Sequence, residues 1–187
     1  MNVEYPKAII FMKVGYHCDE SLEEIIKRKR EEEIIVGKFF WGYGGSLCHP
    51  LTQVKPFILE ALKRKLKPLA LFSPTSSKYI SQAKVAREYS INKKEWYPLP
   101  AGVLIKGGCQ YALICKNLRK VSMPIDLNMY RVATGKNKGK PLREVVKFQV
   151  DKACAFLNQT NNDLLKSKNK ETFYIAEIIE PFAVFLR

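Results

Sequence analysis

The first half of the chain alternates short apolar runs with helical patterns, and this alternation constrains the fold more than any other feature. Apolar runs at 7–14, 34–44 and 68–73 have the length and the β-branched and aromatic content of buried strands. Two segments with helical spacing, 18–33 and 50–67, lie between them. Strand, helix, strand, helix, strand with short connections is typical of parallel βαβ units, so we predict a partly parallel sheet.

Local signals support the helices. Ser21 followed by Glu24 three residues later is a capping-box signature for the helix at 18–33. Pro56 must lie in the first turn of the helix at 50–67 or kink it. A third helix is predicted at 77–90, directly after the third strand.

The second half of the chain has a different pattern. Its apolar runs predict antiparallel strands at 102–108, 110–121, 129–135 and 172–187, the last bent or divided at Pro181. The segment 140–157 has the strongest amphipathic pattern in the chain and predicts one long helix.

The leading fold class is therefore α/β, or α+β overall, with a βαβαβ first half joined to antiparallel strands and a long helix. The alternative is a PUA-like mixed β-barrel with inserted helices, an analogy drawn from element order alone. A chain of 187 residues suits a single domain. We expect a βα-rich half, 1–92, and a β-rich half, 93–187, packed together.

The net charge of +14 is concentrated in two blocks. Residues 55–120 hold fourteen Lys or Arg against three Asp or Glu, and residues 136–170 hold nine against three. A basic surface of this kind attracts polyanions and accelerates their association. We therefore expect DNA, RNA or a nucleotide-like anion as the partner, although the same lysines could serve only to keep the protein soluble.

The cysteines and the apolar runs indicate a compartment. Five cysteines without a CxxC pair argue against a disulfide framework and favour a reducing environment. No apolar run is long enough to cross a bilayer, and no signal-peptide pattern is present. We therefore expect a cytoplasmic protein that does not insert into a membrane.

If the first three strands are parallel neighbours, the loops that follow them meet at one edge of the sheet, where open α/β sheets bind ligands. His17 follows the first strand, and Cys48 and His49 follow the second. A Cys48–His17 pair would suit nucleophilic catalysis, and either histidine would suit general base catalysis. These three residues are the candidate catalytic residues. The spacing does not fit zinc, and we predict neither a metal nor another cofactor.

The glycine-rich segment 37–50, which leads into the second helix, has the composition of an anion cradle. It matches neither a Walker A motif nor a GxGxxG fingerprint, and a tight turn would need the same glycines. The loop after the third strand could add hydroxyl donors, unless its serines only cap the next helix. The candidate ligand-binding residues from these two loops are Gly42, Gly44, Gly45, Ser46, Ser73, Thr75 and Ser76.

The basic segment 133–144 places lysines and glycines directly before a predicted helix. Flexible lysines there suit phosphate contacts, and a solvated loop is the plain alternative. The candidates are Lys136, Lys138, Lys140 and Arg143. Aromatic rings interleave with the basic blocks and could stack on bases if they are exposed. The stacking candidates are Trp41, Tyr43, Trp96 and Tyr97.

These patterns predict a protein that binds nucleic acid or nucleotide phosphates through its basic surface and glycine-rich junction. One alternative is an enzyme that acts on a nucleotide or a phosphorylated small molecule with the His and Cys residues. Another is a basic interaction protein for an acidic protein partner. Zinc-dependent nucleobase deamination is excluded because the chain lacks the HxE and PCxxC signatures.

Overall fold

The structure is a computed structural model that describes residues 5–80, 84–147, 150–158 and 170–187. Its strands are β1 (Ala8–His17), β2 (Phe39–Tyr43), β3 (Pro68–Tyr79), β4 (Glu88–Ser90), β5 (Tyr97–Pro98), β6 (Tyr111–Pro124), β7 (Tyr130–Val132), β8 (Lys152–Leu157) and β9 (Lys170–Leu186). Its helices are α1 (Leu22–Val36), the π-helical turn η1 (Pro50–Val54), α2 (Lys55–Lys63), the 3-10 turn η2 (Leu127–Met129) and α3 (Leu142–Val146).

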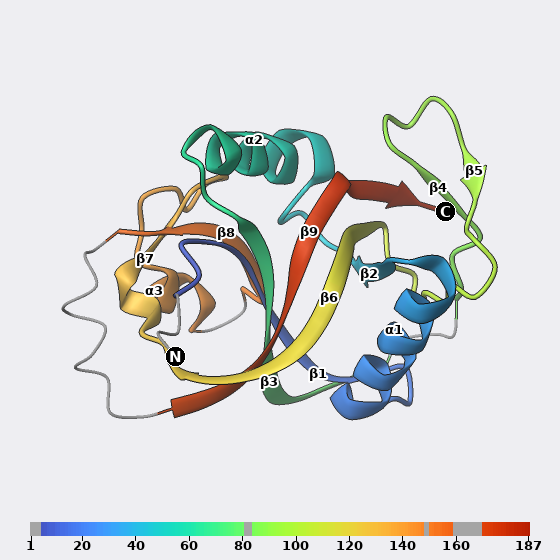
Figure 1. Ribbon diagram of the computed structural model, residues 1–187, viewed down its shortest axis with the longest axis horizontal. Helices are drawn as coiled ribbons and strands as arrows, with labels where there is room; N and C mark the ends of the chain where they lie inside the picture. The colour runs from blue at the N-terminus through green and yellow to red at the C-terminus, as the bar shows by residue number, and fades with distance from the viewer. Residues whose placement is uncertain (1–4, 81–83, 148–149, 159–169) are drawn as a thin grey trace.

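One mixed sheet forms the body of the protein, with the strand order β2-β6-β9-β3-β1-β8-β7 (Figure 1). β1 and β3 are parallel neighbours, as the βαβ pattern predicts, while every other neighbouring pair in this order is antiparallel. The α+β class is thus confirmed. The two end strands, β2 and β7, do not pair with each other in the described part of the chain. The sheet is therefore open, and the alternative of a PUA-like barrel is wrong.

The prediction that all three early strands are parallel neighbours is wrong for β2. β6 and β9 lie between β2 and β3, and each successive pair along that path is antiparallel. β2 therefore runs opposite to β1 and β3, and its carboxyl end lies at the other edge of the sheet. This reversal separates the loops that were expected to meet.

The sheet is covered on both faces, which explains the continuous apolar run of β1. Ala8, Ile10 and Met12 pack in the core beneath α1 and α2. Ile9 and Phe11 point to the opposite face, where η2, β7 and α3 cover them. A strand buried on both sides loses the alternation of a half-exposed strand.

The two ends of helix α1 are set by capping residues, Ser21 at its start and Gly37 at its end. The Ser21 hydroxyl accepts from the Glu24 N–H, and the Glu24 carboxylate accepts from the Ser21 N–H, so the predicted capping box is present. Gly37 ends the helix in the left-handed conformation at φ 77°. Ile34 therefore lies in the helix, 83% exposed, and not in the predicted strand at 34–44. Pro56 lies in the first turn of α2, one of the two placements expected for it, but the predicted helix at 50–67 is divided into η1 and α2 and ends at Lys63.

The helix predicted at 77–90 does not form in the described residues of that segment, and residues 81–83 lie outside them. β3 continues its pairing with β1 as far as the His17–Tyr79 register. Beyond it, β4 pairs with β9. Strand pairing with β1 and β9, which sequence periodicity does not report, outweighs the local helical pattern here.

The long helix predicted at 140–157 is also wrong. α3 is only five residues long, residues 148–149 lie outside the described part, and β8 then pairs with β1. Ala153, Cys154 and Ala155 are all buried because β8 is covered on both faces. A fully buried strand and a helix core give similar apolar patterns, so periodicity alone could not separate them.

The strand predicted at 102–108 is irregular backbone. The Leu104 carbonyl accepts hydrogen bonds from Arg28 Nη1 and Lys29 Nζ of α1. Side chains of a helix therefore satisfy a backbone group that a neighbouring strand was expected to bind. The strand expectations at 110–121 and 172–187 correspond to β6 and β9, and the one at 129–135 to the shorter β7. Within the described residues, no helix is long and apolar enough to span a membrane.

Candidate functional site

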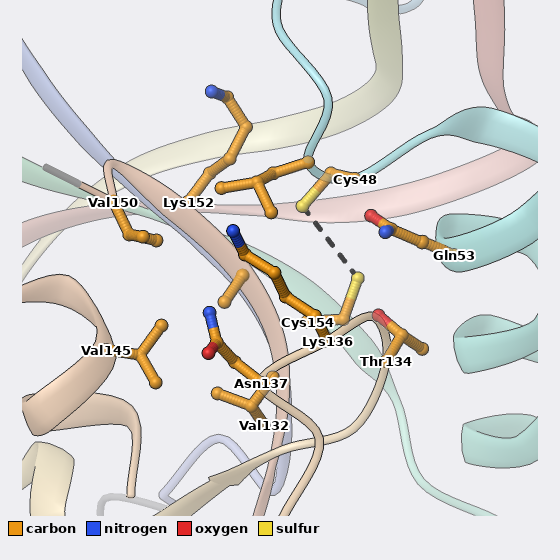
Figure 2. A pocket seen from close by; sticks show the side chains of 12 residues that line it. Cys48, Gln53, Val132, Thr134, Lys136, Asn137, Val145, Val150, Lys152 and Cys154 are labelled. Atoms are coloured by element: carbon orange, nitrogen blue, oxygen red, sulfur yellow. Dashed lines mark hydrogen bonds between the residues drawn. The ribbon is translucent and has the colours of Figure 1, made fainter. Parts of the chain in front are cut away.

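A pocket lies where the glycine-rich segment and the basic segment meet (Figure 2). Leu47 and Cys48 come from the first segment, while Thr134, Lys136 and Asn137 come from the second. Gln53 of η1 and Lys152 and Cys154 of β8 complete the polar part of the lining. Two segments that sequence analysis singled out separately therefore line one site.

The side chain of Gln53 connects the two segments. Its Oε1 accepts a hydrogen bond from the His49 N–H at 3.2 Å. A Cβ added at Gly135 would lie 3.0 Å from Gln53 Nε2. A side chain at position 135 would therefore force the Gln53 amide to shift away from the basic segment.

Lys152 brings a largely buried cation to the glycine-rich loop. Its side chain is 9% exposed, and its Nζ pairs with Asp151 Oδ1 at 2.5 Å. A Cβ built at Gly45 would lie 4.0 Å from the same Nζ, so the ammonium lies beside the backbone of the loop. Because Asp151 is more than half exposed, solvent screens its carboxylate, while the ammonium is largely dry. The Lys152 ammonium is therefore only partly neutralised by Asp151 and can bind an additional anion.

The two thiols of the pocket contact each other. Cys48 Sγ and Cys154 Sγ are 4.0 Å apart, and both residues are buried. The hydrogen bond with Cys154, together with burial, raises the pKa of the Cys48 thiol well above its usual range. The backbone of Cys48 is held by Tyr43, whose hydroxyl donates to the Cys48 carbonyl at 2.7 Å.

His49 caps η1, and this changes the interpretation of the anion cradle. Its Nδ1 accepts from the Thr52 N–H at 3.4 Å, and its carbonyl accepts from the N–H groups of Gln53 and Val54. The N–H groups of Thr52, Gln53 and Val54 at this helix start are therefore already bound within the protein. Burial and the charge of Lys93 lower the pKa of His49. Its ring packs edge-on against Tyr111 and Phe185, so the contacts of His49 are structural.

His17 lies at the other edge of the sheet, at the end of β1. Its ring stacks on Tyr79 with a centroid separation of 5.3 Å. Burial lowers its pKa, opposed by a hydrogen bond to the backbone of Lys106 and by the charge of Glu20. The Cys48 thiol contacts Cys154 and not His17. The juxtaposition that motivated the catalytic hypothesis does not occur.

The other predicted ligand residues divide into two groups. Gly44, Gly45 and Ser46 form the partly or fully exposed loop beside Lys152, so they remain at the candidate site. Gly42 is a packing glycine in β2, because a Cβ there would lie 2.4 Å from Ile105. Ser73, Thr75 and Ser76 lie in β3, outside the pocket lining, and cap no helix of the described residues.

The basic segment keeps its charges in solvent. Lys136, Lys138 and Lys140 are exposed, and Arg143 is exposed on α3. Successive backbone hydrogen bonds close the loop, including Gly139 N–H to the Val132 carbonyl at 2.8 Å. Only Lys136 of these four lines the pocket, and the others extend its positive charge outward.

Two of the four aromatic candidates are buried in the core and therefore cannot stack on a base. Trp41 and Tyr43 are core residues, and Trp41 stacks on Phe72 at a centroid distance of 3.8 Å. Trp96 is partly buried beneath the guanidinium of Arg187, 4.2 Å from its ring. Tyr97 is 46% exposed, but its β5 position is separate from the pocket.

Sequence reasoning missed Lys152 and Cys154 because it placed both on a helix. No sequence feature pointed to Gln53. Thr134 and Asn137 belong to the basic segment but were not among its candidate residues. In the part of the chain that the structure describes, no three His, Cys, Asp or Glu side chains are grouped to hold a metal ion. Comparison with protein-family models, curated proteins and solved structures gave no match to the chain.

Proposed function

We propose that this protein binds the phosphate groups of a nucleic acid or a nucleotide at the pocket between the glycine-rich and basic segments. The observation that carries the proposal is that the two segments line one pocket together with Lys152, whose ammonium lies beside the backbone of Gly45. Lys152 supplies a desolvated cation, and Lys136 supplies a flexible one. A phosphate held by both would gain charge-assisted hydrogen bonds in a partly dry site.

The polar side chains of the pocket fit this role. Thr134 offers a hydroxyl, and Gln53 and Asn137 offer amides that can donate to phosphate oxygens. The unsubstituted backbone at Gly44 and Gly45 permits close approach of a bulky anion. Apolar walls formed by Leu47, Val145 and Val150 reduce the access of competing water.

A longer polyanion has further cations beside the pocket. α2 follows directly from η1 and exposes Lys55 and Lys63, with Arg64, which pairs with Glu60, and Lys65 just beyond its end. Arg64 lies over the ring of Phe156 in β8 at 4.4 Å, so this helix is anchored to the strand that carries Lys152. Backbone phosphates crossing the pocket would meet charge on both sides.

The test is binding of labelled single- and double-stranded DNA and RNA, and of a labelled nucleoside triphosphate, across a salt series. We expect log Kd to change linearly with log salt for the polymers. Replacing Lys136, Lys138 and Lys140 together by alanine should weaken binding and flatten the slope. Replacing the exposed Lys27, Lys78 and Lys84, which lie on α1, β3 and the segment before β4, is the control for an equal loss of charge.

Equal weakening by both triple variants would indicate that only net charge matters, and would contradict a specific pocket. Absence of binding by every nucleic acid and nucleotide at low salt would contradict the proposal altogether. Binding of the nucleotide without the polymers would restrict the ligand to a small molecule. Each result separates the pocket from the general basic surface.

A further inference from the structure

The paired thiols of the pocket lie on two parts of the chain whose backbones are held to different degrees. Cys154 lies in the middle of β8 and is held opposite Ile10 of β1. Cys48 lies in the loop between Gly45 and η1 and has a left-handed backbone at φ 58°. Ladder pairing with β1 holds the strand side, whereas the hydrogen bond from the Tyr43 hydroxyl to the Cys48 carbonyl holds the loop side, so the loop side is the one that can shift more readily.

The approach required for a covalent bond is small. The sulfur atoms are 4.0 Å apart, and a disulfide bond needs about 2.05 Å. The two thiols already face each other across the pocket, as Figure 2 shows. A shift of about 2 Å by the Cys48 loop is sufficient, and Gly44 and Gly45, four and three residues before Cys48, lower the backbone cost of such a shift.

We propose that Cys48 and Cys154 are a redox-active dithiol that hydrogen peroxide converts to a disulfide, and that this disulfide narrows the pocket. The free volume of the pocket is about 10 Å³, which is the space for about one water molecule, and hydrogen peroxide is only slightly larger than water. The bond would draw the glycine-rich loop toward β8 and toward Lys152, which leaves less space for a phosphate. Only this second consequence rests on the proposed function.

The reaction balances within the named groups. One cysteine, as its thiolate, attacks a peroxide oxygen, so that an S–O bond forms, the O–O bond breaks and hydroxide leaves to become water. The second thiol then attacks the sulfenic sulfur, the S–O bond breaks, and a second water leaves. Two thiols lose two electrons and two protons, and one peroxide is reduced to two waters.

The surroundings of the pair set the conditions for this reaction. The Lys152 ammonium favours a thiolate at Cys48, whereas Asp151, burial and the hydrogen bond with Cys154 oppose it. The opposing effects dominate and raise the pKa of Cys48, so oxidation should accelerate as the pH rises above neutral. The pair therefore stays reduced until peroxide is abundant.

The first experiment identifies the bond directly. The reduced full-length protein is treated with hydrogen peroxide, remaining thiols are alkylated, and tryptic peptides are analysed without reduction. We expect a linked pair of peptides containing Cys48 and Cys154, two hydrogens lighter than their sum and separated by dithiothreitol. Cys48→Ser and Cys154→Ser should each lose this species.

Cys115→Ser is the matched control, because Cys115 is a fully buried thiol of β6 outside the pocket. That variant should retain the link. If folded wild-type protein forms no Cys48–Cys154 link while its other cysteines or methionines are oxidised, the dithiol proposal is overturned. The same holds if the link forms only in denaturant.

The second experiment measures nucleotide or oligonucleotide binding by the oxidised and reduced proteins. We expect oxidation to weaken wild-type binding about fivefold and to leave Cys154→Ser unchanged. A link that forms without changing affinity would overturn the narrowing of the pocket. The reduced protein alone tests the proposed function, so the two failures are distinguishable.

Discussion

Gln53 and Gly135 lie side by side at the candidate site, so that η1 and the basic segment meet there although the two residues are 82 positions apart in the sequence. A Cβ at Gly135 would lie 3.0 Å from Gln53 Nε2, and Gly135 has a φ of 75°. The left-handed backbone thus favours glycine at this position, and a Cβ there would also force the Gln53 amide to shift.

Gly135→Ala should therefore lower the free energy of unfolding and weaken phosphate binding. Gly139→Ala is the matched control, because Gly139 has a φ of 87° in the same loop but nothing lies within 4 Å of its Cβ position. Both variants incur a backbone cost of about 1–2 kcal/mol. Only Gly135→Ala should also displace Gln53 and reduce affinity. Equal affinities of the two variants would show that the contact does not shape the site.

Lys152→Met should weaken phosphate binding about tenfold, because it removes the desolvated cation of the pocket. Its effect on stability should be small, since Asp151 is more than half exposed and is hydrated when its partner is lost. Asp151→Asn provides the opposite change, because it removes the anion that competes for Lys152. Isothermal titration with a nucleotide should give weaker binding for the first variant and equal or tighter binding for the second. Tighter binding by Lys152→Met than by Asp151→Asn would show that Lys152 does not contribute to phosphate binding.

Lys29 and Glu32 form a buried ion pair within α1, with Lys29 Nζ 2.7 Å from Glu32 Oε2. Glu32 Oε1 also accepts from the Phe40 N–H, so the pair connects α1 to β2. Lys29→Met should destabilise the fold by about 3 kcal/mol, because it leaves a buried carboxylate without its cation. In the Lys29→Met, Glu32→Gln double variant the charge is gone and the acceptor remains, so part of the loss should be recovered. Urea unfolding measures both, and a double variant less stable than the single one would contradict this account.

The same pair predicts a dependence on pH. Burial lowers the pKa of Lys29 from its ordinary 10.5 to about 8. Between these values the unfolded chain holds a proton that the folded chain has released, so Lys29 adds stability as the pH rises. The difference in unfolding free energy between wild type and Lys29→Met should therefore widen from pH 8 to pH 10. A constant difference would mean that Lys29 does not titrate in this range.

His49 should make the fold less stable in mild acid. Burial and the charge of Lys93 lower its pKa below the ordinary 6.5, so the unfolded chain takes up the proton first as the pH falls. Stability from this group is present above pH 6.5 and is lost as the pH falls through the folded-state pKa. His49→Asn keeps a side-chain acceptor for Thr52 but cannot titrate. Melting temperatures from pH 7.5 to 5 should fall less steeply in the variant, with a remaining slope from His17, whose pKa is also lowered. If melting temperature fell equally steeply with pH in both proteins, His49 would not be the cause of the acid sensitivity.

Sequence patterns predicted the elements whose stability is mainly local. The capping box of Ser21 and Glu24 depends on neighbours within one turn and forms as expected, and Pro56 lies in the first turn of α2, one of its two expected placements. β1 was recognisable because burial on both faces leaves a continuous apolar run. The candidate site was foreseen only in part, as two separate segments without a geometric relation.

Pairing between distant segments decided the rest. Cys154 and Lys152 are on a strand because β1 offers them hydrogen-bond partners, although their apolar neighbours fit a helix equally well. The direction of β2 was set by β6, which begins 68 residues after β2 ends. The amino-acid sequence by itself thus determined the local elements, the positive charge and the flexible glycine-rich and basic loops. Only the tertiary structure decided that these loops meet around Lys152 and separate from His17, because strand order and direction depend on backbone pairing that no local pattern records.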